Sequence, residues 1–270
     1  MYRCTGCETA FVAPQPSADQ LRDFYSEFHK SDEEGGWYDQ AQERTNRDVS
    51  AKLSLIERFA GPETTLLDVG CGRGFFVKAC IDRGIRAQGL DLSDTAVAYA
   101  RDRLHVVAHQ GTLNSLKSAL GRFRAVTLWA TIEHITDPTQ LLSDIADVTE
   151  PGGWLFLDTG VAGDWLEHLL PGVPQWYDPP QHLWVFSSVG LIRLLEAAGF
   201  SAVRVNTCYE RNLLRKAARI ARAAVAASAL RVVAASTRLS CGEFHFTRFP
   251  LGNLMSVVAR RNGTIPDASD

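Results

Sequence analysis

The feature that most constrains this chain is a glycine-rich turn between two apolar segments. The first segment, residues 64–69, is a predicted strand, and it runs directly into Gly70, Gly72 and Gly74. Glycine at these positions leaves no side chain where the backbone must bend sharply and approach a ligand closely. The next predicted strand ends in Asp91, whose carboxylate would lie beside the turn and can accept hydrogen bonds from ribose hydroxyls. The stretch therefore predicts the nucleoside-binding part of an α/β sheet.

The spacing within this turn favours a positively charged nucleoside over a dinucleotide. A nicotinamide or flavin fingerprint, G-x-G-x-x-G, has its third glycine three residues after the second, and here Phe75 occupies that position. Asp68 lies near the end of the first strand, where a carboxylate would repel a pyrophosphate and attract an ammonium or sulfonium group. A dehydrogenase is therefore the weaker alternative.

The rest of the chain alternates between predicted strands and helices. After the strand that ends in Asp91, strands are expected over 105–109, 124–130, 153–158, 201–207 and 253–260, and helices over 74–83, 94–103, 138–148 and 188–198. This alternation predicts a parallel sheet that helices cover on both faces. In such sheets ligands bind beyond the carboxyl ends of the strands, so the glycine turn, Asp91, Gly111-Thr112 and Trp129-Ala130 are expected along one rim.

Composition indicates an ordinary globular enzyme. Apolar residues make up 46% of the 270 residues and the net charge is −3, which indicates no general affinity for nucleic acid. The sequence has no uncharged apolar run of 18 residues and no signal-peptide core, so a cytoplasmic location is expected. Cys4 and Cys7 have the spacing of one zinc knuckle, but a structural zinc needs four ligands and no second pair follows. We therefore predict no metal site and two reduced thiols.

The motif D-x-G-x-G-x-G, followed by an acid that closes the next strand, resembles the class I S-adenosylmethionine-dependent methyltransferases. Residues 123–138 resemble the Glu-His-x-x-Asp-Pro segment of their small-molecule branch, which includes ubiquinone, sugar and tailoring enzymes. Residues 175–187 resemble its Pro-Pro-x-His-x-x-x-Phe-Ser segment, and residues 11–17 resemble a run that follows an N-terminal zinc ribbon in some relatives. The resemblance implies a Rossmann-like, seven-stranded, mostly parallel sheet with an antiparallel last strand and S-adenosylmethionine as cofactor.

The expected domain organisation follows from this resemblance. Residues 1–60 would be an N-terminal extension, irregular over 1–15 and helical over 17–28 and 40–59. The methyltransferase domain would span 61–262, with insertions at 160–187 and 208–245 and a disordered tail at 263–270. The expected cofactor-binding residues are Asp68, Gly70, Cys71, Gly72, Gly74, Asp91, Leu92, Thr112, Leu113, Trp129 and Ala130. Relatives often have an acid that bonds adenine where this chain has Thr112, so a hydroxyl or a backbone group would make that contact here.

Methyl transfer to oxygen or nitrogen requires a group that takes a proton near neutral pH, and histidine is the first candidate. His182 is the expected base, with substrate orientation and a structural role as alternatives. His134 is expected mainly to pack under the fourth strand and hold Glu133. Glu133 would contact substrate or cofactor, or else be a carboxylate at a helix start. Aromatic residues between 160 and 187 favour a ring-bearing acceptor, although a core beneath a lid explains them equally well. These residues are Trp165, Trp176, Tyr177 and Trp184.

The predicted reaction is methylation of a hydroxyl on a sugar, quinone-like or secondary-metabolite acceptor. A C- or N-methyltransferase of the same fold and a nonenzymatic nucleoside-binding module are the alternatives. Residues 211–240 hold seven basic residues and no acid, and Arg211, Arg215, Arg219 and Arg222 fall on one face of a predicted helix. Such a face is typical of a solvated lid or homodimer helix, and it could also contact a membrane surface or a carrier protein.

Overall fold

The computed structural model describes residues 1–17, 20–21, 37–162, 181–206 and 254–263, with the backbone alone for 37–48. Several predicted segments lie wholly or mostly outside these residues. The 208–245 insertion, with the predicted basic helix, lies wholly outside, as do residues 264–270 of the tail. Most of the 160–187 insertion and most of the predicted 17–28 helix lie outside as well. Trp165, Trp176 and Tyr177 lie outside them as well. Within them, no helix has the length and apolar character needed to cross a membrane.

Seven strands form the main sheet, in the spatial order β5-β4-β3-β6-β7-β10-β9. The strands are β3 (Thr65–Val69), β4 (Arg86–Asp91), β5 (Ala108–Gln110), β6 (Phe123–Trp129), β7 (Thr149–Gly160), β9 (Phe200–Asn206) and β10 (Leu254–Arg261). The first five strands are parallel to one another, and β10 runs antiparallel to both β7 and β9. The predicted mostly parallel sheet with an antiparallel last strand is confirmed.

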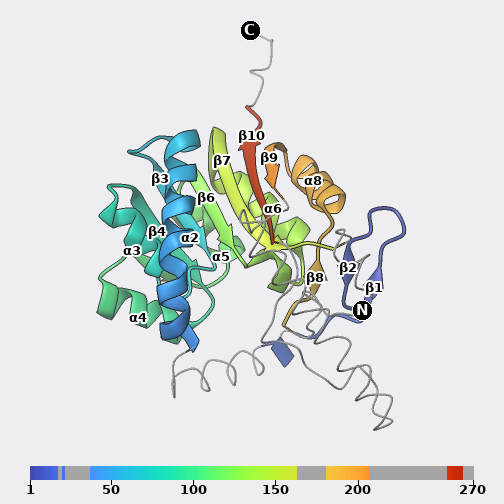
Figure 1. Cartoon of the computed structure of the whole chain (residues 1–270), viewed down its shortest axis with the longest axis horizontal. Coiled ribbons are helices and arrows are strands. Elements are labelled where there is room, and N and C mark those ends of the chain that lie inside the picture. Colours follow the sequence, from blue (N-terminus) through green and yellow to red (C-terminus); the bar gives the residue numbers. More distant parts are fainter. Residues whose placement is uncertain (18–19, 22–36, 163–180, 207–253, 264–270) are drawn as a thin grey trace, which may run out of the picture.

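Helices cover both faces of this sheet. They are α2 (Trp37–Ala60), α3 (Phe75–Asp82), α4 (Asp94–Leu104), α5 (Leu113–Leu120), α6 (Pro138–Val148) and α8 (Ser188–Ala197), together with the short 3-10 helix η1 (Ile132–His134). Successive strand residues point to opposite faces, so Leu66 packs with α2, α3 and α4, while Leu67 packs with α5, α6 and α8. Figure 1 shows α2 crossing in front of the sheet. Both faces are therefore buried, which explains the continuous apolar runs in the strands.

A second, smaller sheet contains β1 (Tyr2–Arg3), β2 (Ala10–Phe11) and β8 (Trp184–Val185). The expectation that residues 1–15 are irregular is therefore wrong for this hairpin. Strands of two residues show no detectable alternation, and the partner of β2 is distant in sequence, so local patterns could not reveal it. Helix α5 was likewise not predicted, and β5 begins at Ala108 rather than at residue 105.

Candidate functional site

The glycine turn between β3 and α3 is closely packed on two sides. Gly70, Gly72 and Gly74 all have positive φ, at 79°, 52° and 80°. A Cβ at Gly70 would lie 2.5 Å from the Oγ1 atom of Thr131, and one at Gly74 would lie 2.9 Å from the Cβ of Ala100. A side chain at either position would collide as well as strain the backbone. The turn therefore has the bare backbone that close approach of a nucleoside requires.

Asp91 lies at the end of β4 and connects two loops of the rim. Its Oδ2 accepts a hydrogen bond from the Gly72 amide at 2.8 Å, and its Oδ1 accepts one from the Ser93 amide at 2.9 Å. Each carboxylate oxygen can accept a further bond. The residue thus fits the expected role of an acceptor for ribose hydroxyls, with its orientation fixed by backbone amides.

Asp68 is buried at the end of β3, where its Oδ1 accepts a hydrogen bond from the Thr127 hydroxyl at 2.6 Å. Burial raises the pKa of this carboxyl to about 7, although the Thr127 bond and the nearby Lys52 charge both oppose the rise. The sequence argument treated Asp68 as a permanent negative charge. In the structure its ionisation near neutral pH depends on what lies beside it.

The remaining residues that the sequence assigned to the cofactor have varied environments. Cys71 and Leu113 direct their side chains into the core, whereas Leu92 is 62% exposed. Thr112 caps α5 by accepting a bond from the Ser115 amide. Because their side chains lie in the core, Cys71 and Leu113 can contact the cofactor only through backbone atoms.

Trp129 and Ala130, at the end of β6, lie beside an ion pair that the sequence did not reveal. Lys52 Nζ lies 2.9 Å from Asp158 Oδ2 and 4.1 Å from the centroid of the Trp129 ring. Asp158 Oδ1 in turn accepts a hydrogen bond from the Ala130 amide at 2.8 Å. Ala130 has a positive φ of 48°, so this carboxylate supports a backbone turn that non-glycine residues seldom adopt.

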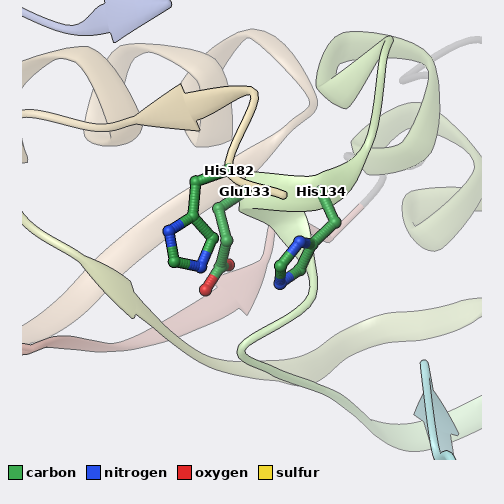
Figure 2. A group of neighbouring side chains, drawn as sticks. All are labelled: Glu133, His134 and His182. Atoms are coloured by element: carbon green, nitrogen blue, oxygen red, sulfur yellow. The ribbon is translucent and has the colours of Figure 1, made fainter. Parts of the chain in front are cut away.

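A carboxylate and two imidazoles gather where η1 meets the segment before β8. The ligating atoms of Glu133, His134 and His182 all lie within 4.8 Å of one another, and the two imidazole rings are 5.0 Å apart. Figure 2 shows the three side chains directed toward a common region. Glu133 is 2% exposed, and its Oε2 accepts a hydrogen bond from the Thr159 hydroxyl at 3.0 Å. Its carboxylate is therefore buried and faces the two imidazoles, rather than solvent at a helix start.

Two hydrogen bonds hold the His182 segment against η1. His134 Nδ1 donates a hydrogen bond to the Gln181 carbonyl at 2.6 Å. The Leu183 amide donates to the Glu133 carbonyl at 2.8 Å. The residues on both sides of His182 are thus bonded to η1.

The electrostatics of this cluster are set by burial. Burial raises the pKa of Glu133 to about 7, a rise that the positive charge of His182 opposes and the charge of Asp158 reinforces. Burial also lowers the pKa of His134 below its ordinary value. A buried carboxyl that titrates near neutrality beside two imidazoles is an arrangement suited to proton transfer.

The structure brings together the three residues that the sequence proposed for catalysis, Glu133, His134 and His182. It adds Thr159, Asp158 and Lys52, which sequence reasoning missed. The rule that polar residues at the carboxyl ends of strands line the site would have found Asp158 and Thr159, because they close β7. Lys52 carried no such signal within its helix.

Cys4 and Cys7 are free and half-buried in the β1–β2 turn. Among the residues that the structure describes, the only group of three or more potential metal ligands is the cluster at Glu133. The prediction of two reduced thiols without zinc remains a prediction.

Residues 21–205 match the family model described as a methyltransferase domain. The chain belongs to the methyltransferase-domain family. Its fold is that of the class I S-adenosylmethionine-dependent methyltransferases, and the cofactor of this class is S-adenosylmethionine.

Relatives and solved structures agree with this assignment. The chain is 33% identical over 119 residues to a ubiquinone biosynthesis O-methyltransferase of Nitrosospira multiformis, covering 40% of this chain and 48% of the relative. It is 29% identical over 157 residues to the enzyme of the same name from Idiomarina loihiensis, covering 52% and 63%. The chain thus spans about half the length of the first of these curated relatives.

Two solved structures share the fold at low sequence identity. The [4+2]-cyclase SpnF has a TM-score of 0.61 and 18% identity, covering 94% of this chain and 99% of that one. The magnesium protoporphyrin IX methyltransferase of Synechocystis, solved with S-adenosylhomocysteine, has a TM-score of 0.60 and 13% identity, covering 91% and 100%. At such low identities the similarity concerns the fold alone, which here is the seven-stranded sheet with its covering helices.

Proposed function

We propose that this methyltransferase transfers the methyl group of S-adenosylmethionine to a hydroxyl of a small-molecule acceptor, with sugars and quinone-like rings as the first classes to test. The observation that carries the proposal is the cluster of the buried Glu133 with the half-buried His134 and His182. The cluster adjoins the glycine turn, because Thr131, two residues before Glu133, packs against Gly70. The O-methyltransferase names of the curated relatives support oxygen as the acceptor atom.

The residues around the turn fit the cofactor. The bare backbone from Gly70 to Gly74 would accommodate the nucleoside, and Asp91 would accept bonds from its ribose hydroxyls. S-adenosylmethionine supplies a methyl group on a sulfonium, which departs as a neutral thioether. No charge has to be neutralised by a metal, so the main tasks left to the protein are alignment and removal of a proton.

His182 is the proposed base. As the acceptor oxygen forms its bond to the methyl carbon, its O–H bond breaks and the proton moves to the imidazole. The nearby Glu133 carboxylate stabilises the imidazolium that results, and the Thr159 hydroxyl fixes the orientation of that carboxylate. His134 has a different role here, because its Nδ1 bond to the Gln181 carbonyl holds the loop that carries the base.

Activity assays with isotopically labelled S-adenosylmethionine and a panel of hydroxylated acceptors test this proposal. With an accepted substrate, His182→Ala should lower kcat by roughly 10²–10⁴-fold, which is the usual contribution of a general base. The Kd for S-adenosylmethionine should remain unchanged, because the glycine turn is intact. His105→Asn, which replaces an exposed imidazole at the end of α4, is the matched control and should retain full activity.

The wild-type kcat should rise with pH across the range near 6–7 in which imidazoles titrate. Because His182 and Glu133 interact, the apparent pKa values will belong to the pair. Full activity of His182→Ala would remove the proposed base. Ordinary binding of the cofactor without transfer to any acceptor would instead favour the nonenzymatic binding module, and label recovered on carbon or nitrogen would reassign the acceptor atom.

Two imidazoles and a carboxylate are also a donor set that divalent transition metals use, and the spacing in this cluster favours that role as a second candidate. Dialysis against EDTA followed by elemental analysis separates the two roles. Base catalysis predicts that the dialysed protein retains its kcat. A loss of activity that added Zn²⁺ or Mn²⁺ restores would assign the cluster to a metal.

A further inference from the structure

The N-terminal hairpin lies against the segment that carries His182. Strand β2 pairs with β8 in antiparallel register, and the Val12 amide donates a hydrogen bond to the Leu183 carbonyl at 2.9 Å. Figure 1 shows the hairpin beside β8. Leu183 is therefore held from two directions, by Val12 at its carbonyl and by the Glu133 carbonyl at its amide. His182 immediately precedes this doubly anchored residue.

A second contact fixes the other end of β8. The Ser187 amide donates to the Thr9 Oγ1 at 3.2 Å, and the two hydroxyl oxygens are 3.3 Å apart. The Ser187 hydroxyl also bonds the Cys7 carbonyl and caps α8 by accepting a bond from the Gly190 amide. A Cβ at Gly190 would lie 2.1 Å from the Thr9 Oγ1, so the hairpin can dock here only because this position is glycine.

A row of aromatic rings links the hairpin to η1. Ring centroids are 6.1 Å apart for Tyr2 and Phe11, and 5.8 Å apart for Phe11 and Trp184. Trp184 Nε1 donates to the Ile135 carbonyl at 2.8 Å, directly after η1. The hairpin, β8 and η1 thus form one continuous set of contacts around His182.

We infer that the N-terminal hairpin, residues 1–12, positions His182, and that Thr9 is the positioning residue at its docking point. This inference rests on the proposed role of His182 as base. A base must be held close to its productive geometry, since a displacement of about 1 Å can cost 10²-fold in rate. The hydrogen bonds from η1 hold the His182 segment on one side only, and the hairpin holds it on the other side. The hairpin touches no part of the glycine turn in these contacts, so it acts on turnover and leaves cofactor binding unaffected.

Thr9→Val tests this inference because it removes the hydroxyl while keeping the shape of the side chain. We expect kcat to fall roughly 10–100-fold, with the Kd for S-adenosylmethionine unchanged, at temperatures well below the Tm of the variant. Thr9→Ser should restore the wild-type kcat. Thr149→Val is the matched control and should retain kcat. Thr149 is also a buried threonine, at the start of β7 and far from the Thr159 end of that strand, and its hydroxyl donates to the Ile145 carbonyl.

A double-mutant cycle separates positioning from a general loss of stability. In the His182→Ala background, Thr9→Val should cause no further fall in kcat, because the group that it positions is gone. Equal fractional losses in both backgrounds, or an unchanged kcat in Thr9→Val, would overturn the inference. If His182→Ala itself kept full activity, the proposed function would fail instead, so the two failures are distinguishable.

A second variant protects the test against misfolding. Phe11→Ala shortens the aromatic row without altering the Thr9 contact, and it should give the same pattern of lower kcat with unchanged cofactor Kd. In the wild type and in Phe11→Ala, NMR of protein labelled at histidine would follow the ring resonances of His182. A changed titration curve in the variant supports positioning. An identical curve together with wild-type kcat contradicts it.

Discussion

The two halves of the site are built in different ways. The proposed cofactor side is centred on one contiguous stretch, Asp68 to Asp91, and depends mainly on backbone geometry at three glycines. The proposed acceptor side brings together side chains from η1, β7 and the segment before β8, and a hairpin far away in sequence packs against that segment. A turn that binds through its backbone can therefore be recognised from a short stretch of sequence, whereas the side-chain cluster forms only when the sheet brings distant segments together.

This difference also separates the electrostatics. Asp91 is oriented by two backbone amides at the rim. Glu133 is buried among ionisable neighbours, and burial raises its pKa to about 7. The ionisation of Glu133, like that of Asp68 beneath the glycine turn, therefore responds to pH and to burial, while the turn itself depends on shape. Three substitutions test this division.

The largest effect is expected at Gly70. Gly70→Ala combines a positive φ with a Cβ placed 2.5 Å from Thr131, and it should weaken S-adenosylmethionine binding by about 100-fold or more in calorimetry. Gly84→Ala is the control, since Gly84 has a φ of 88° but nothing within 4 Å of an added Cβ. That variant should lose about 1–2 kcal/mol of stability to backbone strain and retain cofactor affinity. Equal losses of affinity in both would show that the turn does not act through close packing.

The next effect concerns stability against pH at Glu133. The pKa of this carboxyl is raised in the folded protein to about 7 from an ordinary 4.5, so the folded state binds more protons than the unfolded state between these values. The free energy of unfolding of the wild type should therefore fall as pH rises through 7. The contribution of Glu133 to this fall in the free energy of unfolding should be on the order of 3 kcal/mol between pH 4.5 and about pH 7, and in Glu133→Gln that contribution should be absent.

Denaturant unfolding from pH 5 to pH 8 measures this change. The groups facing Glu133 are His182, His134 and Asp158, and they remain in the variant, as does Asp68 with its own raised pKa. Glu57→Gln is the control, because it makes the same substitution at a carboxylate that is not buried and that pairs with Arg83 at the surface. Parallel curves for wild type and Glu133→Gln would contradict the raised pKa.

The smallest of the three effects is expected at Asp91. Asp91→Ala should weaken S-adenosylmethionine binding by ~1–3 kcal/mol, because ribose hydroxyls lose their acceptor. Saturating cofactor should restore kcat, since the acceptor side is untouched. Asp94→Ala removes the same charge from the first turn of α4 and should have no effect on binding. Tight binding of NAD by the wild type would contradict the cofactor assignment.

The sequence predicted most of the main sheet because each strand and helix has its own periodic signal. It also predicted the glycine turn and Asp91, where local spacing carries the chemistry. It named Glu133, His134 and His182 but not their mutual geometry, since that depends on pairings across the sheet. The raised pKa of Asp68 escaped prediction because burial, rather than residue type, causes it. Thr9 and Gly190 gave no local indication that they touch.

The docking of Thr9 beside Ser187 joins residues 178 positions apart in sequence. At about 5–20 residues per second, ribosomes would finish the partner strand roughly 9–36 s after the hairpin emerges. Throughout that interval the backbone groups of Ala10 and Phe11 have no β8 to pair with, and unpaired strand edges invite association with other chains. The hairpin is thus synthesised well before the strand with which it pairs, and in a newly synthesised chain its exposed edge needs another group to cover it until β8 is made.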